Sequence, residues 1–506
     1  MIEFSDVTFK YSTVTADGKN EDIAGVKELN ITIKDGEFLV LTGGSGCGKT
    51  TVIRLINGLI PAFYNGEMSG TVTIGNRNIK DMSIYEVSEM VGSVFQNPRT
   101  QFFNVNTTDE IAFAAENRCM NPEKIREMIR KTADSMKIKE LLWRNIFELS
   151  GGEKQMIACA GVNVLSPDII VLDEPSSNLD HHAIKKLERI LRRWKEQGKT
   201  IIIAEHRLFY LKDLADRMLV MDSGKIKAEF DTKRLQALSY EESEALGLRP
   251  MELNDIPFRK KAENPAPGNM ELKDFSFAYK EKRHSISIPD LKIPVGSITA
   301  VIGHNGAGKS TLVRNICGLE KKCKGILVFN GKSMRYKERL HNCYMIMQDV
   351  NHQLFTESVI DEVMLSMTDK SLSEDVKKER AGKILAELDL ADKTETHPMA
   401  LSGGQKQRTA IASGIASDKP IIIFDEPTSG LDLHHMKQVA NQMEKLKKLG
   451  KTVLIVTHDH EFILRCCDHI IHMAGGRIKE TYDLNENTID RLNDFISAKD
   501  GGNENV

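Results

Sequence analysis

The chain contains an internal repeat that covers most of its length. The segment GGSGCGKTT at 43–51 recurs as GHNGAGKST at 303–311, and LSGGEKQ at 149–155 recurs as LSGGQKQ at 401–407. The first pair is displaced by 260 residues, whereas the second pair and every later matched pair are displaced by 252. Self-similarity at this spacing indicates one fold built twice, and 506 residues are enough for two separate hydrophobic cores.

The halves differ locally in length. We place eight extra residues of the first half around IPAFYNGEMSG (60–70) and eight more in TVTADGKNEDIAG (13–25), which we expect to be a loop. Between the halves, residues 249–269 combine charges with four prolines and no sustained apolar period, which is typical of a linker. We therefore predict a first domain at 1–245, a linker at 246–268 with the boundary near Asn264, a second domain at 269–490 and a C-terminal tail at 491–506.

Short apolar runs alternate with longer helical patterns inside each half. Runs such as FLVLTG, IIVLDE and TIIIAEH are apolar without interruption, as in strands that are buried on both faces of a parallel sheet. The pattern predicts an α/β fold with a mainly parallel sheet in each half.

Composition argues against several functions. The formal net charge of −3, from 69 basic and 72 acidic residues, lacks the basic excess of proteins that bind nucleic acid. Neither the N-terminal segment nor any apolar run has the features of a signal peptide or of a membrane span of roughly 18 residues, so we expect membrane contact only through partners. The cysteines lack CxxC spacing and are typical of reduced cytosolic thiols: Cys47, Cys119, Cys159, Cys317, Cys323, Cys343, Cys466 and Cys467.

Each half carries the pattern GxxxxGK[ST] after an apolar run. In this pattern backbone N–H groups close around phosphates, the lysine reaches the outer phosphates, and the next hydroxyl holds Mg²⁺. A glycine-rich turn without function could explain one match, but two matches followed by the same motif series make that alternative much weaker. The predicted binding residues are Gly43, Gly44, Ser45, Gly46, Cys47, Gly48, Lys49, Thr50 and Thr51, and then Gly303, His304, Asn305, Gly306, Ala307, Gly308, Lys309, Ser310 and Thr311. Thr50 and Ser310 are the hydroxyls predicted to hold the metal.

Two carboxylates end an apolar run in each half, in IIVLDEP and IIIFDEP. Asp173 and Asp425 suit Mg²⁺, and Glu174 and Glu426 can polarise an attacking water. A pair of acids on a surface loop is the alternative, but the hydrophobic run before them and the proline after them favour a strand end.

Histidine and tyrosine supply further candidates. His206 and His458 each lie 32 residues after the glutamate of their half. A histidine at a strand end is more often structural, but the equal spacing favours a contact with the γ-phosphate. Tyr11 and Tyr279 are candidates to stack on adenine, with core packing a nearly equal alternative.

The repeated LSGG segment has no evident use within its own half. Its hydroxyl and glycine N–H groups open a helical run and form an anion-binding surface, yet each half already has a phosphate-binding loop. The candidate residues are Ser150, Gly151 and Gly152, and Ser402, Gly403 and Gly404.

The order of these motifs resembles the ATP-binding cassette (ABC) ATPases in both halves. The resemblance implies two tandem P-loop NTPase domains, each with an antiparallel β subdomain and a helical signature subdomain, that bind and hydrolyse ATP with Mg²⁺. It adds Gln96 and Gln348 as nucleotide and Mg²⁺ contacts. In that family the signature caps the ATP of the opposite cassette, so Ser150 is expected to face ATP at Lys309, and Ser402 to face ATP at Lys49.

Three segments narrow the resemblance to the ATPases of energy-coupling factor transporters. They are QNPRTQFFNVNTTDEIAF (96–113), QDVNHQLFTESVIDEV (348–363) and LINGLIPAFYNGEMSG (55–70), although QDVNHQ departs from the usual QNPxxQ. This resemblance implies a motor at the cytoplasmic face of the membrane, working with a transmembrane energy-coupling protein and a small substrate-binding membrane protein to import a vitamin or a transition-metal ion. RTQFF (99–103) and HQLF (352–355) are candidate docking segments, although sequence does not separate exposed from buried aromatic residues.

Three alternatives remain. A twin-cassette ATPase of the translation-associated kind is expected to have a long charged helical linker, whereas this linker is short and contains prolines. ATPases of other ABC importers, such as fused sugar importers, often have one degenerate cassette, whereas both halves here retain their motifs. A purely structural ATP clamp is the third alternative, and the two intact glutamates argue against it.

Overall fold

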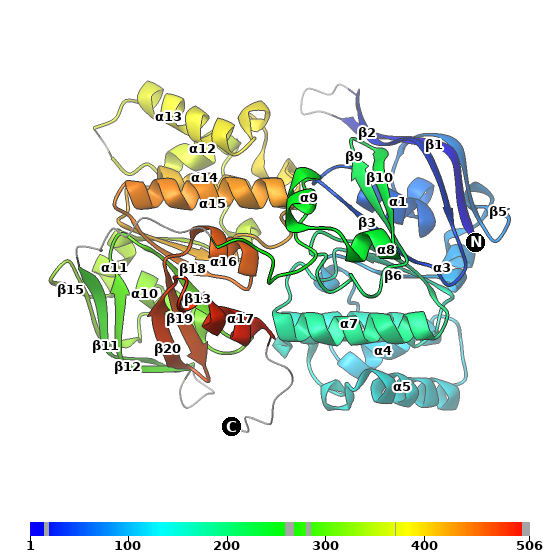
Figure 1. Ribbon diagram of the computed structural model, residues 1–506, viewed down its shortest axis with the longest axis horizontal. Helices are drawn as coiled ribbons and strands as arrows, with labels where there is room; N and C mark the ends of the chain where they lie inside the picture. Colours follow the sequence, from blue (N-terminus) through cyan, green and yellow to red (C-terminus); the bar gives the residue numbers. More distant parts are fainter. Residues whose placement is uncertain (15–19, 259–267, 280–284, 370, 498–506) are drawn as a thin grey trace. The chain divides into compact units, whose positions relative to one another are not determined.

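The computed structural model describes residues 1–14, 20–258, 268–279, 285–369 and 371–497. Backbone contacts divide the chain into two compact units, Met1–Asp255 and Ile256–Val506 (Figure 1). Each unit contains a four-stranded antiparallel sheet and a six-stranded sheet that is parallel except for one edge strand. The predicted α/β fold of two tandem domains is therefore confirmed.

In the first unit the antiparallel sheet has the order β2-β1-β4-β5 and the larger sheet the order β10-β9-β3-β8-β7-β6. The strands are β1 (Ile2–Val14), β2 (Asn20–Ile33), β3 (Phe38–Gly43), β4 (Gly66–Ile74), β5 (Arg77–Asn78), β6 (Val91–Val94), β7 (Ile169–Asp173), β8 (Thr200–Ala204), β9 (Arg217–Asp222) and β10 (Lys225–Asp231). The helices are α1 (Lys49–Ile56), α2 (Leu59–Ala62), α3 (Ile84–Met90), α4 (Thr107–Glu116), α5 (Pro122–Met136), α6 (Gly151–Asn163), α7 (His181–Glu196), α8 (Thr232–Gln236) and α9 (Tyr240–Ala245).

The second unit repeats this arrangement, with sheet orders β12-β11-β14-β15 and β16-β17-β18-β13-β19-β20. The strands are β11 (Asn269–Phe277), β12 (Ile286–Pro294), β13 (Ile298–Ile302), β14 (Lys324–Phe329), β15 (Lys332–Met334), β16 (Cys343–Ile346), β17 (Ile421–Asp425), β18 (Thr452–Val456), β19 (His469–Ala474) and β20 (Arg477–Asp483). The helices are α10 (Lys309–Cys317), α11 (Tyr336–Asn342), α12 (Val359–Leu365), α13 (Glu374–Glu387), α14 (Gly403–Ala416), α15 (Leu433–Lys448), α16 (His460–Cys466) and α17 (Ile489–Ser497).

The larger sheet is buried on both faces, which explains its uninterrupted apolar runs. Successive residues of β3 point to opposite sides, so Phe38 joins one hydrophobic cluster and Leu39 joins another. Strands β3, β6, β7, β8 and β9 are parallel, and Asp173 at the end of β7 pairs with Ala204 at the end of β8. The carboxyl ends of these strands therefore meet at one edge, where an open α/β sheet binds ligands.

Three segments differ from expectation. The predicted loop at 13–25 is largely strand, because β1 and β2 pair antiparallel as far as Val14 and Asn20. The predicted linker begins with residues that pack into the first core, including Leu248, while the boundary near Asn264 lies outside the described residues. Helix α17 runs into the segment predicted as a tail and buries Leu492.

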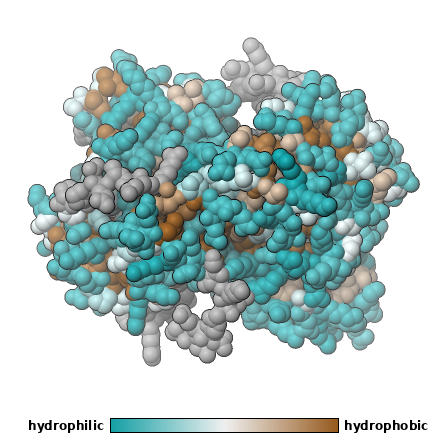
Figure 2. Space-filling model, in the orientation of Figure 1, coloured by the Kyte–Doolittle hydropathy of each residue, from teal (hydrophilic) through white to brown (hydrophobic). Residues whose placement is uncertain are grey.

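Among the described residues, no helix combines the length and the apolar character needed to cross a membrane. The face drawn in Figure 2 is mostly hydrophilic, with apolar residues scattered over it.

Candidate functional site

The two glycine-rich loops join a central strand to a helix in each unit. In the first, β3 ends at Gly43 and α1 begins at Lys49, whose ammonium donates to the carbonyl oxygens of Gly43 and Gly44 at 3.0 Å each. Gly43 has φ 137°, and a Cβ there would lie 2.1 Å from the carbonyl oxygen of Met221. Only glycine lets the backbone turn this tightly against β9.

The second loop has the same geometry. Strand β13 ends at Ile302, α10 begins at Lys309, and the lysine donates to the carbonyl oxygen of Gly303 at 2.7 Å. A Cβ on Gly303 would lie 2.3 Å from the carbonyl oxygen of Met473. Both loops therefore place a buried lysine and a helix N-terminus at the carboxyl edge of the sheet, which suits phosphate groups.

A hydroxyl and a carboxylate meet beside each loop. Thr50 Oγ1 donates to Asp173 Oδ1 at 3.2 Å. In the second unit Ser310 Oγ donates to Asp425 Oδ1, also at 3.2 Å. These hard oxygen donors fit Mg²⁺, which prefers one or two protein oxygens together with nucleotide phosphates. Bound there with a nucleotide, the metal would neutralise phosphate charge.

Burial raises the pKa of both aspartates. For Asp173 the loss of solvent, followed by repulsion from Glu174, raises the pKa to about 6. Burial likewise raises the pKa of Asp425. Burying an ionised carboxylate costs free energy unless a cation lies close to it. A metal ion bound beside either aspartate would offset that cost.

Three strand ends converge on the glutamate of the first unit. Gln96 Nε2 donates to Glu174 Oε2 at 2.7 Å, and His206 Nε2 lies 3.2 Å from Glu174 Oε1. Glu174 has φ 43°, in the left-handed region, and its N–H donates to the carbonyl oxygen of Ala204 at 2.8 Å. The backbone of Glu174 is therefore in a strained conformation at the position where its carboxylate meets the glutamine and histidine loops.

The second unit repeats most of this arrangement. Glu426 has φ 53°, its N–H donates to the carbonyl oxygen of Val456 at 2.8 Å, and His458 Nε2 lies 3.4 Å from its Oε1. Gln348 follows β16 as Gln96 follows β6. Gln407 Nε2 donates to the backbone carbonyl oxygen of Glu426 at 3.1 Å.

The LSGG segments open helices in both units. Ser150 caps α6, and Glu153 Oε2 accepts from both the N–H and the hydroxyl of Ser150 at 2.8 Å. Ser402 caps α14 in the same way, with Gln405 in the place of Glu153. The glycines that follow each serine form the first helical turn, whose free N–H groups suit an anion.

Comparison with known proteins identifies this set of features. The sequence profile described as ABC transporter matches residues 26–177 and 286–429, which include both glycine-rich loops and both carboxylate pairs. A putative ABC transporter ATP-binding protein of Treponema denticola is 43% identical over 485 residues, covering 94% of this chain and 96% of that protein. The chain belongs to the ABC transporter ATP-binding protein family. Its two cassettes bind ATP with Mg²⁺ and hydrolyse ATP.

Two further similarities agree with this assignment. A second protein of Treponema denticola with the same description is 36% identical over 489 residues, covering 96% of this chain and 97% of that protein. The solved structure of an archaeal ribosome recycling factor bound to a ribosomal stalk protein is 21% identical, with a TM-score of 0.62, and covers 97% of this chain and 92% of that chain. The similarity to the ribosome recycling factor shows a shared fold.

The aromatic residues predicted to stack on adenine differ between the cassettes. The hydroxyl of Tyr11 lies 3.1 Å from Thr51 Oγ1 and accepts from Arg54 at 3.2 Å, and the Tyr11 ring packs edge-on against Phe9 and Tyr64. Tyr279 packs edge-on against Phe277 and is exposed. The structure thus places Tyr11 partly in the core, and its contact with adenine stays a prediction.

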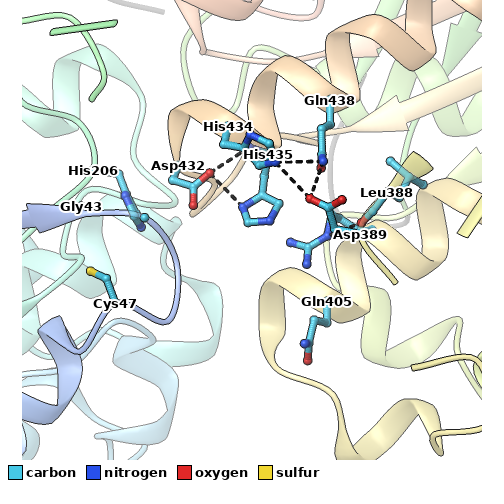
Figure 3. Close-up of polar contacts among 12 residues, drawn as sticks. Gly43, Cys47, His206, Leu388, Asp389, Gln405, Asp432, His434, His435 and Gln438 are labelled. Carbon is cyan, nitrogen blue, oxygen red and sulfur yellow. Dashed lines mark hydrogen bonds and ion pairs between the residues drawn. The ribbon is translucent and has the colours of Figure 1, made fainter. Parts of the chain in front are cut away.

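The second cassette contains a polar cluster that sequence reasoning did not find. Asp432, which ends the segment SGLD, accepts from the backbone N–H of His435 and lies 2.8 Å from the ring nitrogen Nδ1 of His435 (Figure 3). Next to it, Asp389 contacts the ring of His434 and the amide of Gln438 (Figure 3). Burial acts to raise the pKa of Asp389, but the hydrogen bonds with His434 and Gln438 outweigh it, so the pKa is lowered.

The first cassette lacks this arrangement at the equivalent positions. Asp180 accepts from the backbone N–H of Ala183 at 2.8 Å, so alanine stands where the second cassette has a histidine. The repeat could have revealed this difference from the sequence. When SNLD is aligned with SGLD, Ala183 of the first half falls opposite His435 of the second. The two cassettes therefore share their motifs but differ in the contacts around them.

Proposed function

We propose that the protein is the ATP-hydrolysing motor of an importer of the energy-coupling factor type. In this proposal it works at the cytoplasmic face of the membrane with a transmembrane energy-coupling protein and a small substrate-binding membrane protein. The transported solute is a vitamin or a transition-metal ion. The observation that carries the proposal is an exposed group of apolar side chains beside the segment that follows Gln96.

We call this group the aromatic face and define it as Phe103, Val105, Trp143 and Phe147. Their exposed fractions are 75%, 57%, 73% and 77%. Two chain segments bring them together, because Ile146 N donates to the carbonyl oxygen of Val105 at 2.8 Å and Asn106 bridges antiparallel to Asn145. Exposed apolar side chains gathered in this way mark an interaction surface.

The aromatic face is connected to the ATP site through one short segment. Gln96 contacts Glu174, and seven residues later the chain reaches Phe103, whose N–H donates to Glu110 Oε2 at 3.0 Å. Glu110 is buried and also accepts from the backbone N–H of Asn104 at 2.8 Å. A partner held on the aromatic face would therefore be connected to the glutamine that contacts the predicted catalytic carboxylate.

The second cassette offers a related but more polar surface. Phe355 is 74% exposed and Met399 is 53% exposed, while exposed Glu357 and Glu395 occupy the positions equivalent to Val105 and Trp143. One backbone bond is shared, since Val359 N donates to the carbonyl oxygen of Thr396 at 3.0 Å as Thr107 N donates to that of Arg144. Pro398 stands at the position of Ile146 and has no N–H to donate. We propose that the partner presents an apolar segment to the first cassette and a segment with a basic residue to the second.

The signature residues complete the proposal. Each cassette has its own phosphate-binding loop and a second helix N-terminus at Ser150 or Ser402. We propose that the two halves form two composite ATP sites, each with the loop of one cassette and the signature of the other. The family resemblance supports this arrangement, in which Glu174 and Glu426 polarise water and His206 and His458 contact the γ-phosphate.

Two other functions are to be distinguished from this proposal. A translation-associated twin-cassette ATPase has ribosomal partners, and the similarity to the ribosome recycling factor is one of fold alone. The ATPase of another ABC importer would use different membrane partners. Copurification from native membranes, followed by uptake assays with cobalt, nickel and vitamins, tests the proposal. Recovery with ribosomes would overturn it, and recovery with a membrane protein outside the energy-coupling factor group would overturn its subgroup.

A further inference from the structure

A buried carboxylate precedes the histidine of the first cassette. Glu205 follows β8 directly, and its exposed fraction is 1%. Its Oε1 accepts from Ser176 N at 3.1 Å and from the hydroxyl of Tyr210 at 2.7 Å. Its Oε2 accepts from the backbone N–H groups of His206 at 2.7 Å and Arg207 at 3.2 Å. Four donors therefore surround one carboxylate, so both of its oxygens accept hydrogen bonds.

These bonds connect two loops that carry the predicted catalytic groups. Ser176 lies on the loop that begins with Glu174, and His206 lies on the loop after β8, directly after Glu205. Glu174 N also donates to the carbonyl oxygen of Ala204, the residue before Glu205. Because the Glu205 side chain holds the Ser176 loop on one oxygen and the His206 loop on the other, the two loops keep a fixed spacing.

The second cassette is built differently at this position. Thr457 replaces Glu205, and its hydroxyl accepts from Asp459 N at 3.1 Å, a bond within its own loop. Phe462 replaces Tyr210 and is fully buried. The distance between histidine and glutamate is 3.2 Å in the first cassette and 3.4 Å in the second.

We propose that Glu205 is a positioning residue of the first ATP site, which holds His206 against Glu174 during hydrolysis. This inference rests on the roles proposed above for Glu174 and His206. Glu205 contacts neither the nucleotide loop nor the metal-binding aspartate in the bonds described, so it acts through the two loops it joins. Its removal should slow turnover and leave ATP binding in place.

Substitution by glutamine tests this directly. The side chain of glutamine has one oxygen that accepts and one NH₂ group that donates, whereas both carboxylate oxygens of Glu205 accept hydrogen bonds. The favoured orientation places the amide toward Ser176 and Tyr210, since the tyrosine hydroxyl can rotate and accept while the two N–H groups on the other side cannot. Glu205→Gln therefore breaks the bond to the Ser176 loop and preserves the bonds to the His206 loop.

The assay measures kcat and KM for ATP in the full chain carrying Glu426→Gln, so that turnover reports the first site. We expect Glu205→Gln to lower kcat by about tenfold, with KM nearly unchanged, because misplacement of a catalytic group slows the chemical step. In a His206→Ala background the same substitution should have little further effect. Glu229→Gln, which alters an exposed carboxylate paired with Arg217, is the matched control and should leave kcat unchanged.

The outcomes separate the inference from the function on which it rests. If His206→Ala leaves first-site turnover intact, the proposed role of His206 fails. If His206→Ala lowers turnover but Glu205→Gln does not, or if the two losses multiply independently, the positioning role of Glu205 is wrong. Should Glu205→Gln fail to fold, Glu205→Thr combined with Tyr210→Phe carries the test, because threonine and phenylalanine already occupy the equivalent positions as Thr457 and Phe462. An unchanged kcat in that variant would overturn the inference.

Discussion

Replacing Phe103 by aspartate should release the protein from the membrane partner proposed above while leaving the fold intact. The ring is 75% exposed and stacks on Phe113 at a centroid distance of 4.9 Å. A phenylalanine side chain buries roughly 200 Å² when fully covered, so about 150 Å² remains for a partner to bury. At about 25 cal/mol per Å² this is worth about 4 kcal/mol, or roughly a several-hundredfold loss of affinity.

The cost to the fold should be much smaller. Losing the stacked ring pair removes about 1 kcal/mol, which lowers the unfolding temperature by only a few degrees in a domain of this size. The assay compares the fraction of protein bound to membranes that contain its partner, basal ATP hydrolysis and thermal unfolding. Leu449→Asp is the matched control, because Leu449 is 68% exposed at the end of α15, outside the aromatic face. Phe355→Asp tests the second cassette in the same way.

The reasoning would be refuted if Phe103→Asp stayed bound to membranes and active in uptake. It would also be refuted if Leu449→Asp were released as readily, since the loss would then reflect surface charge rather than the aromatic face. A loss of basal hydrolysis in step with release would show that the ring supports the ATP site instead of a partner.

Three further predictions concern the ATP sites. Glu174→Gln combined with Glu426→Gln should retain ATP binding but lower steady-state hydrolysis by about a hundredfold or more, and undiminished phosphate release would contradict the assignment of the glutamates. Ser150→Arg should impair nucleotide trapping at the loop of Lys309 in single-site variants, and selective loss at the loop of the first cassette instead would show that the signature acts within its own half. Because burial raises the pKa of Asp173 to about 6, protons should compete with Mg²⁺ as the pH falls below that value, with affinity for Mg²⁺ at the first site falling about tenfold between pH 7 and pH 5. A titration of Mg²⁺-dependent nucleotide binding that is flat over this range would contradict the role of Asp173.

Several conclusions needed only the sequence. The repeat predicted two α/β domains, which the structure contains, and the matched motifs predicted Thr50 and Asp173 as metal contacts and Glu174 and His206 as catalytic groups. The structure brings Thr50 to Asp173 and His206 to Glu174, and the roles of these residues stay predictions. These predictions were possible because each motif is short and lies at a strand end. The carboxyl ends of neighbouring parallel strands must share one edge of the sheet.

The remaining features depend on which segments pack together, and no local pattern determines that. Phe102 packs against the core while the adjacent Phe103 is exposed, and the sequence around them does not distinguish the two rings. Residues 13–14 and 20–25 are strand because β1 and β2 pair with each other, and their polar sequence does not predict this pairing.

Glu205 shows the difference most clearly. From the sequence it is one acidic residue between an apolar run and a histidine, and nothing in AEHR distinguishes it from a solvated side chain. The fold brings Ser176 and Tyr210 to its carboxylate from the neighbouring loop and from the turn that follows. The sequence by itself determined the family, the nucleotide and the candidate chemistry, because these depend on residue types at fixed local spacing. Only the tertiary structure decided which carboxylates are buried, which aromatic residues are exposed and how the cassettes differ, because burial and hydrogen bonding depend on segments distant in the chain.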